Sequence, residues 1–381
     1  MTEVAIIGIG IKPFRRYPDS RGVDHGVEAV RAALKDAGAE WSEMQFAFGG
    51  TRSGGNNTDP ILPLLGQTGI QLTNVANGCA TGGAAMASAY NAIVSGQYDV
   101  GVALGFEKYP RGALMALPEI WALPSWMGST GLMPTTQYFA MKAQRYMHEH
   151  GVAPEVLGLV AEKAFHNGSL NPIAWRREAL SAEQVMGSPM VSDPLTKYMF
   201  CNPSDGGAAV ILCRADIAHR FHPKPVYLRA STVRSRLFGS FDVFGPSAMT
   251  PLPEAPSTLA ARAAFEAAGI GPSDIDLAQL QDTEAGAEVI HMAEVGLCAD
   301  GEQTALIRDG ATRIGGRIPI NTDGGCMANG EPVAASGLRQ VYESVVQLRG
   351  AAGPRQVEGA RTAMTQVYGA PGIAGCAILT V

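Results

Sequence analysis

Hydrophobic positions along this chain fall into short apolar blocks and into longer stretches in which an apolar residue recurs every three or four positions. In the first half the apolar blocks predict β-strands at residues 4–8, 45–48, 72–76 and 100–104. The stretches between them predict helices near residues 23–37, 59–69 and 81–95. A further apolar block at 208–212 closes this half. Strands that alternate with helices predict an α/β fold, in which helices cover the sheets.

The second half repeats the plan of the first. A helical pattern ends at Gly38 and is followed by a polar linker and an apolar strand, and the same succession recurs at Gly269, 231 positions later. Glycine directly after the last helical residue is a C-cap signal in both copies. We therefore infer that an α/β unit was duplicated. Strands of the second half are expected near 224–228, at 275–280 and at 377–381.

Residues 109–200 interrupt this plan with a region rich in Pro, Trp and Met that holds one clear helix, at 138–150. A long insertion between strands usually shapes a binding site. We expect an N-terminal half, residues 1–216, that carries this inserted loop domain, and a C-terminal half, residues 217–381. An apolar set in the insertion either lines a pocket for a bulky ring or belongs to the core: Trp121, Trp126, Met127, Met133, Tyr138, Phe139 and Met141.

Composition narrows the class of protein. The 381 residues are 46% hydrophobic and 17% charged, enough for a substantial core, and the net charge of -6 argues against a nucleic-acid binder. The N-terminus reads as a strand rather than a signal peptide, and no run approaches the roughly 20 apolar residues of a membrane span, so a cytoplasmic location is expected. The six cysteines form no Cys-x-x-Cys or Cys/His cluster, which indicates neither a disulfide framework nor a metal site.

The most informative cysteine is Cys79, in the run from Asn77 to Gly83 between a predicted strand and an Ala-rich helix. At a helix N-terminus the free backbone N–H groups favour thiolate over thiol, and flanking glycines permit close approach of a substrate. The pattern therefore predicts a nucleophile. The alternative is a small, inert residue buried in a tight turn.

An ordered series of motifs resembles the thiolases, most closely the sterol-carrier-protein type, and covers nearly the whole chain. The matching segments are residues 75–82, 105–108, 193–196, 203–209, 294–298, 321–325 and 347–350. The resemblance implies a thiolase fold: two duplicated βαβαβ-type halves in a five-layered α/β/α/β/α core, an inserted loop domain and a homodimer.

The resemblance also implies an activity. In thiolases a cysteine thiolate, here Cys79, attacks the keto carbon of a β-ketoacyl-CoA, a C–C bond breaks, and the acyl group passes from the enzyme to CoA. Coenzyme A is then a co-substrate, and no bound cofactor is expected. Contacts with the CoA substrate are expected at Gly325, Gly330, Gly372 and, by a looser match to a loop-domain motif, His166.

Two motifs depart from the family pattern. Relatives carry Gly-His-Pro where this chain has Gly330-Glu331-Pro332, so a neutral donor is replaced by a carboxylate. Sterol-carrier-type enzymes carry His-Asp-Cys-Phe where this chain has residues 281–284, Gln-Asp-Thr-Glu. Gln281 still offers an amide donor, but the hydroxyl of Thr283 is far too weak an acid to replace a thiol.

Three residues are candidates for the missing acid/base and oxyanion groups. Glu331 is expected to point at Cys79, although it could instead pair with a surface cation. Cys326 could supply a second thiol for acid/base work, or it could have only a packing role. Tyr368 could donate a hydrogen bond from its hydroxyl to an oxyanion. Cys376, inside the last predicted strand, is assigned to the core.

Three functions stay open on these residues. The first is a divergent thiolase with an acyl-enzyme on Cys79. The second is a retro-aldolase like those of steroid side-chain degradation, which cleaves a β-hydroxyacyl-CoA without an acyl-enzyme. The third is a non-catalytic lipid-CoA carrier subunit. Some relatives with altered motifs work with a small OB-fold and zinc-ribbon subunit, so such a partner is also expected from the resemblance.

Overall fold

The computed structural model describes residues 2–52, 57–110, 112, 114 and 117–381. Most of its strands belong to one sheet of order β3-β2-β4-β7-β1-β8-β11-β10-β9, and β5 pairs with β6 separately. The strands are β1 (Val4–Arg15), β2 (Phe46–Gly50), β3 (Gln71–Asn74), β4 (Val100–Glu107), β5 (Met190–Ser192), β6 (Leu195–Thr196), β7 (Asp205–Arg214), β8 (Val226–Ser235), β9 (Leu277–Leu280), β10 (Thr362–Gly369) and β11 (Ile373–Thr380).

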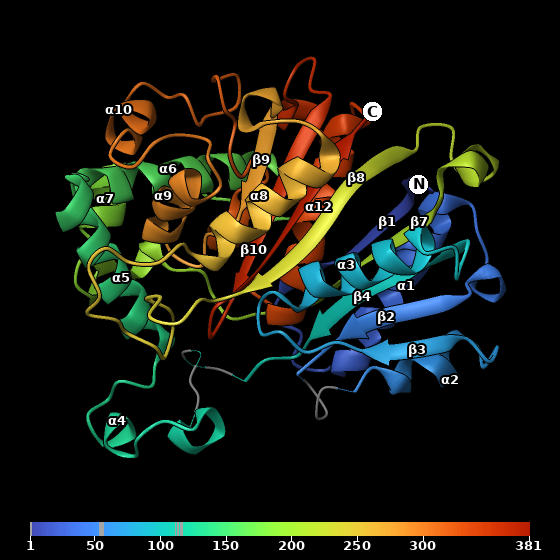
Figure 1. Cartoon of the computed structure of the whole chain (residues 1–381), viewed down its shortest axis with the longest axis horizontal. Coiled ribbons are helices and arrows are strands. Elements are labelled where there is room, and N and C mark those ends of the chain that lie inside the picture. Colours follow the sequence, from blue (N-terminus) through green and yellow to red (C-terminus); the bar gives the residue numbers. More distant parts are fainter. Residues whose placement is uncertain (1, 53–56, 111, 113, 115–116) are drawn as a thin grey trace.

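Helices pack on the strands of both halves, so that layers of helices alternate with layers of strands (Figure 1). The α-helices are α1 (Gly22–Ala37), α2 (Leu62–Leu65), α3 (Thr81–Val94), α4 (Trp126–Ser129), α5 (Thr135–His150), α6 (Glu155–Leu170), α7 (Ala182–Met186), α8 (Pro256–Ala268), α9 (Ala285–Glu294), α10 (Gln303–Arg308), α11 (Gly325–Asn329) and α12 (Ser336–Leu348). Helix α1 packs on β1, β7 and β4, whereas α8 packs on β8 and β11. Helices α3 and α12 contact strands of both halves and each other. This arrangement is the predicted five-layered α/β/α/β/α core.

The strand pairing repeats in the two halves. In the first half β2 and β4 are parallel, and β4–β7 and β7–β1 are antiparallel. In the second half β9 and β10 are parallel, and β10–β11 and β11–β8 are antiparallel. Strand β3 lies beside β2, and Ile320 forms the corresponding parallel bridge to Ala278 of β9. The halves meet where β1 pairs with β8. We propose the division at residues 216 and 217, inside the 3-10 helix Ala215–Arg220 that links β7 to β8.

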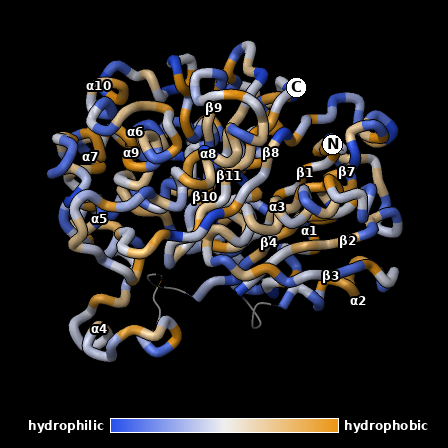
Figure 2. The backbone as a smooth tube through the Cα atoms, in the orientation of Figure 1, coloured by the Kyte–Doolittle hydropathy of each residue, from blue (hydrophilic) through white to orange (hydrophobic). Residues whose placement is uncertain are grey.

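The apolar residues that predicted the strands form the interior. Residues of β1, β4 and β7 are buried almost throughout, and the hydrophobic colour of Figure 2 follows the strands and inner helices. Two expected elements differ. Strand β1 continues to Arg15 because it stays paired with β7, and the helix expected at 59–69 is reduced to two short turns that end at Leu65. Gly66, which follows Leu65 with φ 132, explains the early end, because its backbone conformation is not helical.

The inserted region supplies α4–α7 and the small β5–β6 hairpin, and its segment around α4 projects away from the rest of the molecule (Figure 1). Helix α6 packs on α9 and α11 of the C-terminal half, which ties the insertion to the core. Among the described residues no helix combines the length and the apolar character needed to cross a membrane.

Candidate active site

A locked turn between β3 and α3 presents Cys79. The Oγ1 of Thr81 donates a hydrogen bond to the Gly78 carbonyl (2.7 Å) and accepts one from the Asn77 N–H (2.9 Å). Gly78 has φ +58, and a Cβ there would lie 2.7 Å from the Ala370 carbonyl oxygen, so only glycine suits this position. Cys79 is half-buried and lines a cavity of about 290 Å³.

Glycines also bring α3 close to the elements that carry the rest of the site. A Cβ at Gly82 would lie 3.0 Å from the backbone nitrogen of Leu338 in α12, and one at Gly83 would lie 2.6 Å from Cγ1 of Val367 in β10. The close contact of α3 with α12 sets the Cys79 turn beside the loop that precedes α12. The glycines after Cys79 therefore serve helix packing in addition to substrate approach.

Glu331 is fully buried and is the centre of the site. Its Oε2 accepts hydrogen bonds from Ser336 Oγ (2.6 Å), Cys326 Sγ (3.1 Å) and Gln281 Nε2 (3.2 Å). The Cys79 thiol is a neighbour of the same carboxyl group, because the charge of Glu331 acts on the pKa of that thiol. The structure thus brings together four of the residues that the sequence singled out, from three separate segments, and Glu331 pairs with no surface cation among the described residues.

Charge and burial work against ionisation at this centre. Burial raises the pKa of Glu331, and the hydrogen bonds from Ser336, Cys326 and Cys79 offset part of that rise. Burial and the Glu331 carboxylate raise the pKa of the Cys79 thiol well above its usual value. Burial and the neighbouring carboxylate thus act against the thiolate that a helix N-terminus favours, and the thiolate character of Cys79 stays a prediction.

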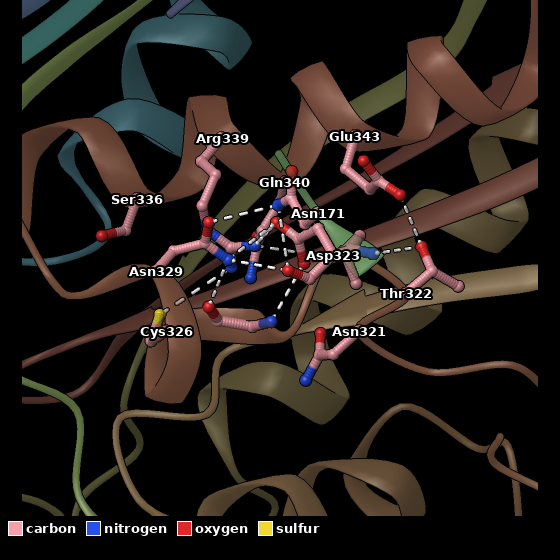
Figure 3. A network of polar contacts seen from close by, with 12 residues as sticks. Asn171, Asn321, Thr322, Asp323, Cys326, Asn329, Ser336, Arg339, Gln340 and Glu343 are labelled. Carbon is pink, nitrogen blue, oxygen red and sulfur yellow. Dashed lines mark hydrogen bonds and ion pairs between the residues drawn. The ribbon is translucent and has the colours of Figure 1, made fainter. Parts of the chain in front are cut away.

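The floor of the site is a polar network of buried residues (Figure 3). The carboxylate of Asp282 accepts hydrogen bonds from the N–H groups of Cys326 (2.6 Å) and Met327 (3.4 Å). Arg339 of α12 pairs with Asp323 and approaches Cys326 Sγ at 3.8 Å. These contacts fix the 323–331 loop, which carries both Cys326 and Glu331.

The three glycines expected to contact CoA instead meet neighbours within the protein. A Cβ at Gly325 would lie 1.9 Å from Asp282 Oδ2, one at Gly330 2.8 Å from Ser204 Oγ, and one at Gly372 2.8 Å from Asp242 Cγ. All three have positive φ. His166 is exposed on α6. In the described part of the chain the lining of the Cys79 cavity includes none of the four, so their contact with CoA stays a prediction.

Tyr368 belongs to a second, much smaller cavity. Its hydroxyl donates to Asp242 Oδ1 (2.8 Å) and accepts from the Val243 N–H (3.3 Å), and burial with the Asp242 carboxylate raises its pKa well above the usual value. Thr283 and Glu284 line the same cavity. The structure therefore does not bring the Tyr368 hydroxyl to Cys79 or Glu331, and its role as an oxyanion donor stays a prediction. Cys376 is buried in β11, in the core as expected.

The wall of the Cys79 cavity is largely apolar, with one cationic side chain at Arg52. Its lining residues are Thr51, Arg52, Val75, Ala76, Gly78, Cys79, Thr81, Leu114, Ile120, Trp121, Thr135, Phe244, Val333 and Ala370. Of the apolar set expected in the insertion only Trp121 lies here. Tyr138 and Phe139 line the Tyr368 cavity, and Met127 and Met133 are buried core residues.

Three residues of the site carried no local sequence signal. Cys201 is buried, and its charge raises the pKa of the Cys79 thiol. Asp323 and Arg339 pair across 16 positions between a loop and a helix. Only the fold brings such residues together, although Asp323 lies within a segment that matched the family.

Comparisons with known proteins agree with this geometry. Residues 246–380 match the family described as thiolase C-terminal domain-like. An acetyl-CoA acetyltransferase of Methanothermobacter thermautotrophicus is 36% identical, over 98% of this chain and 97% of the relative. Sterol carrier protein 2 of Gallus gallus is 32% identical, over 100% of this chain and 71% of the relative. Among solved structures the Ltp2-ChsH2(DUF35) aldolase has a TM-score of 0.88 and 26% identity, with 100% of this chain and 98% of that chain covered.

A five-layered fold with a half-buried cysteine at the start of a central helix defines a thiolase-type enzyme of the acyltransferase kind. The chain belongs to the thiolase family, which confirms the resemblance found in its motifs.

Proposed function

We propose that the protein is a divergent thiolase that cleaves or forms a C–C bond of a β-ketoacyl-CoA through an acyl-enzyme on Cys79. The observation that carries the proposal is the Glu331 carboxyl group, on which the Cys79 thiol, the Cys326 thiol and the Gln281 amide converge. A buried carboxylate with a raised pKa is suited to take and return a proton near neutral pH. Glu331 thus replaces the acid/base groups that this chain lacks.

The reaction follows from these contacts. Glu331 takes the Cys79 proton, and the thiolate attacks the keto carbon of the substrate. The bond between the α- and β-carbons breaks, its electron pair goes to the α-carbon as a thioester enolate, and that carbon takes the proton back from Glu331. The acyl group is left on Cys79 as a thioester. The thiol of CoA then gives its proton to Glu331, its sulfur attacks the acyl carbon, and Cys79 leaves as a thiolate that Glu331 reprotonates.

The cavity favours a bulky apolar acyl group. Leu114, Ile120, Trp121 and Phe244 supply most of its apolar wall. Arg52, whose guanidinium lies 5.9 Å from the centroid of the Tyr109 ring, supplies the positive charge. Apolar walls with few polar groups are typical of small-molecule sites and bind the acyl part by burial of its surface.

A retro-aldolase is the second candidate, and similarity to the Ltp2-ChsH2(DUF35) aldolase supports it. In that reaction Glu331 takes the hydroxyl proton of a β-hydroxyacyl-CoA, the C–C bond breaks to a carbonyl compound and an enolate, and Cys79 forms no bond. The third candidate, a lipid-CoA carrier, requires a buried and unreactive thiol. The position of Cys79 on the wall of a 290 Å³ cavity argues against it.

One experiment separates the three candidates. The protein is incubated with β-keto and β-hydroxy CoA thioesters of varied bulk, with and without free CoA, and the products are identified by mass spectrometry. We expect repeated turnover of the β-keto thioester only with free CoA, one equivalent of acyl-enzyme without it, and the loss of both in Cys79→Ala. The control is Cys298→Ala, because Cys298 is also half-buried but lies outside the site. Cleavage of a β-hydroxy thioester by Cys79→Ala without CoA would establish the aldolase, and binding without turnover would establish the carrier.

We further propose a homodimer and a small OB-fold, zinc-ribbon partner subunit. The relative that was solved as a complex with ChsH2(DUF35) supports a partner. Expression of the chain alone and together with the product of the neighbouring gene, followed by co-purification and light scattering, tests both. Full activity of a monomer expressed alone would contradict both proposals.

A further inference from the structure

Arg339 is a buried cation close to the reacting groups. Its side chain is 1% exposed, and it extends from α12 toward the 323–331 loop (Figure 3). The guanidinium pairs with Asp323 and reaches Cys326 Sγ at 3.8 Å. Arg339 thus joins the helix after the site to the loop that carries Glu331.

Three carboxyl groups surround this cation. Asp282, Asp323 and Glu331 are each buried, and a buried carboxylate is costly unless a positive charge or hydrogen bonds compensate it. Arg339 places a positive charge near these three carboxyl groups. It directly lowers the pKa values of Asp282, Glu331 and the Cys326 thiol, against the rise caused by burial.

We propose that Arg339 is a positioning residue for Glu331: it holds the 323–331 loop in place and supplies the charge that keeps the Glu331 carboxylate ionised and ready to accept the Cys79 proton. The inference rests on the proposed role of Glu331 as the base. The family resemblance assigned no role to position 339. Arg339 reaches Glu331 through Cys326, whose Sγ lies 3.8 Å from the guanidinium and 3.1 Å from Glu331 Oε2.

Arg339 favours a negative charge on Glu331. The other groups that face Glu331 either disfavour that negative charge or are neutral. Cys79, Cys201 and Cys326 become anionic when they titrate, and Asp282 is a carboxyl group. Gln281 and Ser336 are neutral donors. Loss of the Arg339 charge therefore disfavours negative charge at the Glu331–Cys79 pair, and the pH at which the pair loses its protons should rise.

The test compares the pH dependence of two processes in Arg339→Met/Asp323→Asn, which removes both charges of the buried pair. These are alkylation of Cys79 by iodoacetamide, followed by mass spectrometry, and kcat/KM for thioester cleavage. Asp323 acts in the opposite direction to Arg339, but Arg339 has the larger effect on Glu331, so we expect the rising limb of both profiles to move upward by a net shift of up to about half a pH unit. Arg339→Lys keeps the charge and should leave both limbs near their wild-type positions.

The matched control is Arg355→Met/Glu343→Gln, another buried ion pair that also involves α12. In this control variant the rising limbs of both pH profiles should stay at their wild-type positions. The proposal is overturned if the folded double variant at 339 and 323 keeps the wild-type limbs, if Arg339→Lys moves them as far, or if the control moves them equally. Should the double variant fail to fold, Arg339→Lys alone still decides: a shift of one unit with the charge retained would overturn the proposal.

Alkylation does not require turnover, so the two proposals fail separately. A shifted alkylation limb in a protein that cleaves no thioester would support the role of Arg339 and contradict the proposed reaction. Cleavage through Cys79 with unshifted pH profiles would support the proposed reaction and contradict the role of Arg339.

Discussion

At the scale of single residues, the site depends on one carboxyl group that two thiols contact. Glu331 is buried and accepts hydrogen bonds from Ser336, Cys326 and Gln281, so its Oε2 is held in place for the proton transfer that we propose. A thiol with a raised pKa becomes a nucleophile only when a base removes its proton at the moment of attack. Resting Cys79 is therefore protected, and reactivity depends on Glu331.

The first prediction concerns turnover in Glu331→Gln. The amide keeps the shape and part of the hydrogen bonding of the carboxylate but cannot exchange a proton. Loss of a general acid/base lowers the rate by about 10² to 10⁴. We expect kcat to fall by that order, with little change in substrate affinity and with one limb of the pH profile lost. A wild-type rate in this variant would show that Glu331 is a structural residue and would direct attention to Cys326.

The second prediction concerns the thiol of the same variant. The Glu331 carboxylate raises the pKa of Cys79, so its removal should lower that pKa and increase alkylation of Cys79 at a fixed pH near neutrality. Turnover and thiol reactivity should thus change in opposite directions. Cys213 and Cys376 are buried and distant in sequence from the site, and their slow alkylation should stay unchanged. Slower alkylation of Cys79 in Glu331→Gln would contradict this charge effect on the resting thiol and would show that Glu331 acts as its base during alkylation as well.

At the scale of elements, α3 and α12 set the geometry because each packs on both halves. Gly83 permits the approach of α3 to β10, where a Cβ would lie 2.6 Å from Cγ1 of the branched Val367 side chain. Val367 is buried and cannot move aside without disturbing its neighbours. The glycine-rich start of α3 is therefore a packing device as well as part of the nucleophile motif.

The third prediction follows from this contact. Gly83→Ala should lower the free energy of unfolding by about 1–3 kcal/mol, because the overpacked Cβ outweighs the better helix propensity of alanine. The control is Gly158→Ala in α6, where the nearest atoms belong to the end of the exposed, flexible Met186 side chain. That variant should change stability by less than about 1 kcal/mol. Urea denaturation measures both, and equal effects would contradict the packing role.

How much the sequence predicts also differs between elements. Apolar blocks and glycine caps located α1, α3, β2 and β4 closely, because local patterns decide them. The site was predicted through the family motifs at Cys79, Gln281 and Glu331. The pair Asp323–Arg339 could not be predicted, since its partners meet only after α12 packs on the loop. Tyr368 shows the same limit, because the nearby Asp242 that binds its hydroxyl lies 126 positions away.

At the scale of the whole molecule, many ionisable groups are buried, and this has consequences for stability. Burial raises the pKa of Asp282 and of Glu284 to about 8 each. Glu284 caps α9 by accepting a hydrogen bond from the Gly286 N–H, and it lines the small cavity that also holds Tyr368. The folded chain therefore binds protons that the unfolded chain releases between pH 4 and 8, with an unfolded glutamate pKa of about 4.3.

The last prediction gives the sign of this linkage. A carboxyl group with a folded pKa above its unfolded value stabilises the protein at low pH, and that contribution is lost as pH rises toward the folded pKa. We expect the free energy of unfolding to decline between pH 5 and 8, with Glu284 contributing roughly 1.4 kcal/mol per pH unit. Glu284→Gln keeps the oxygen that caps α9 but cannot titrate, so its decline should be shallower by that amount. Urea denaturation at pH 5, 6, 7 and 8 compares the two slopes. Parallel curves for the two proteins would show that Glu284 is ionised in the folded state, with Lys142 as its neighbouring cation.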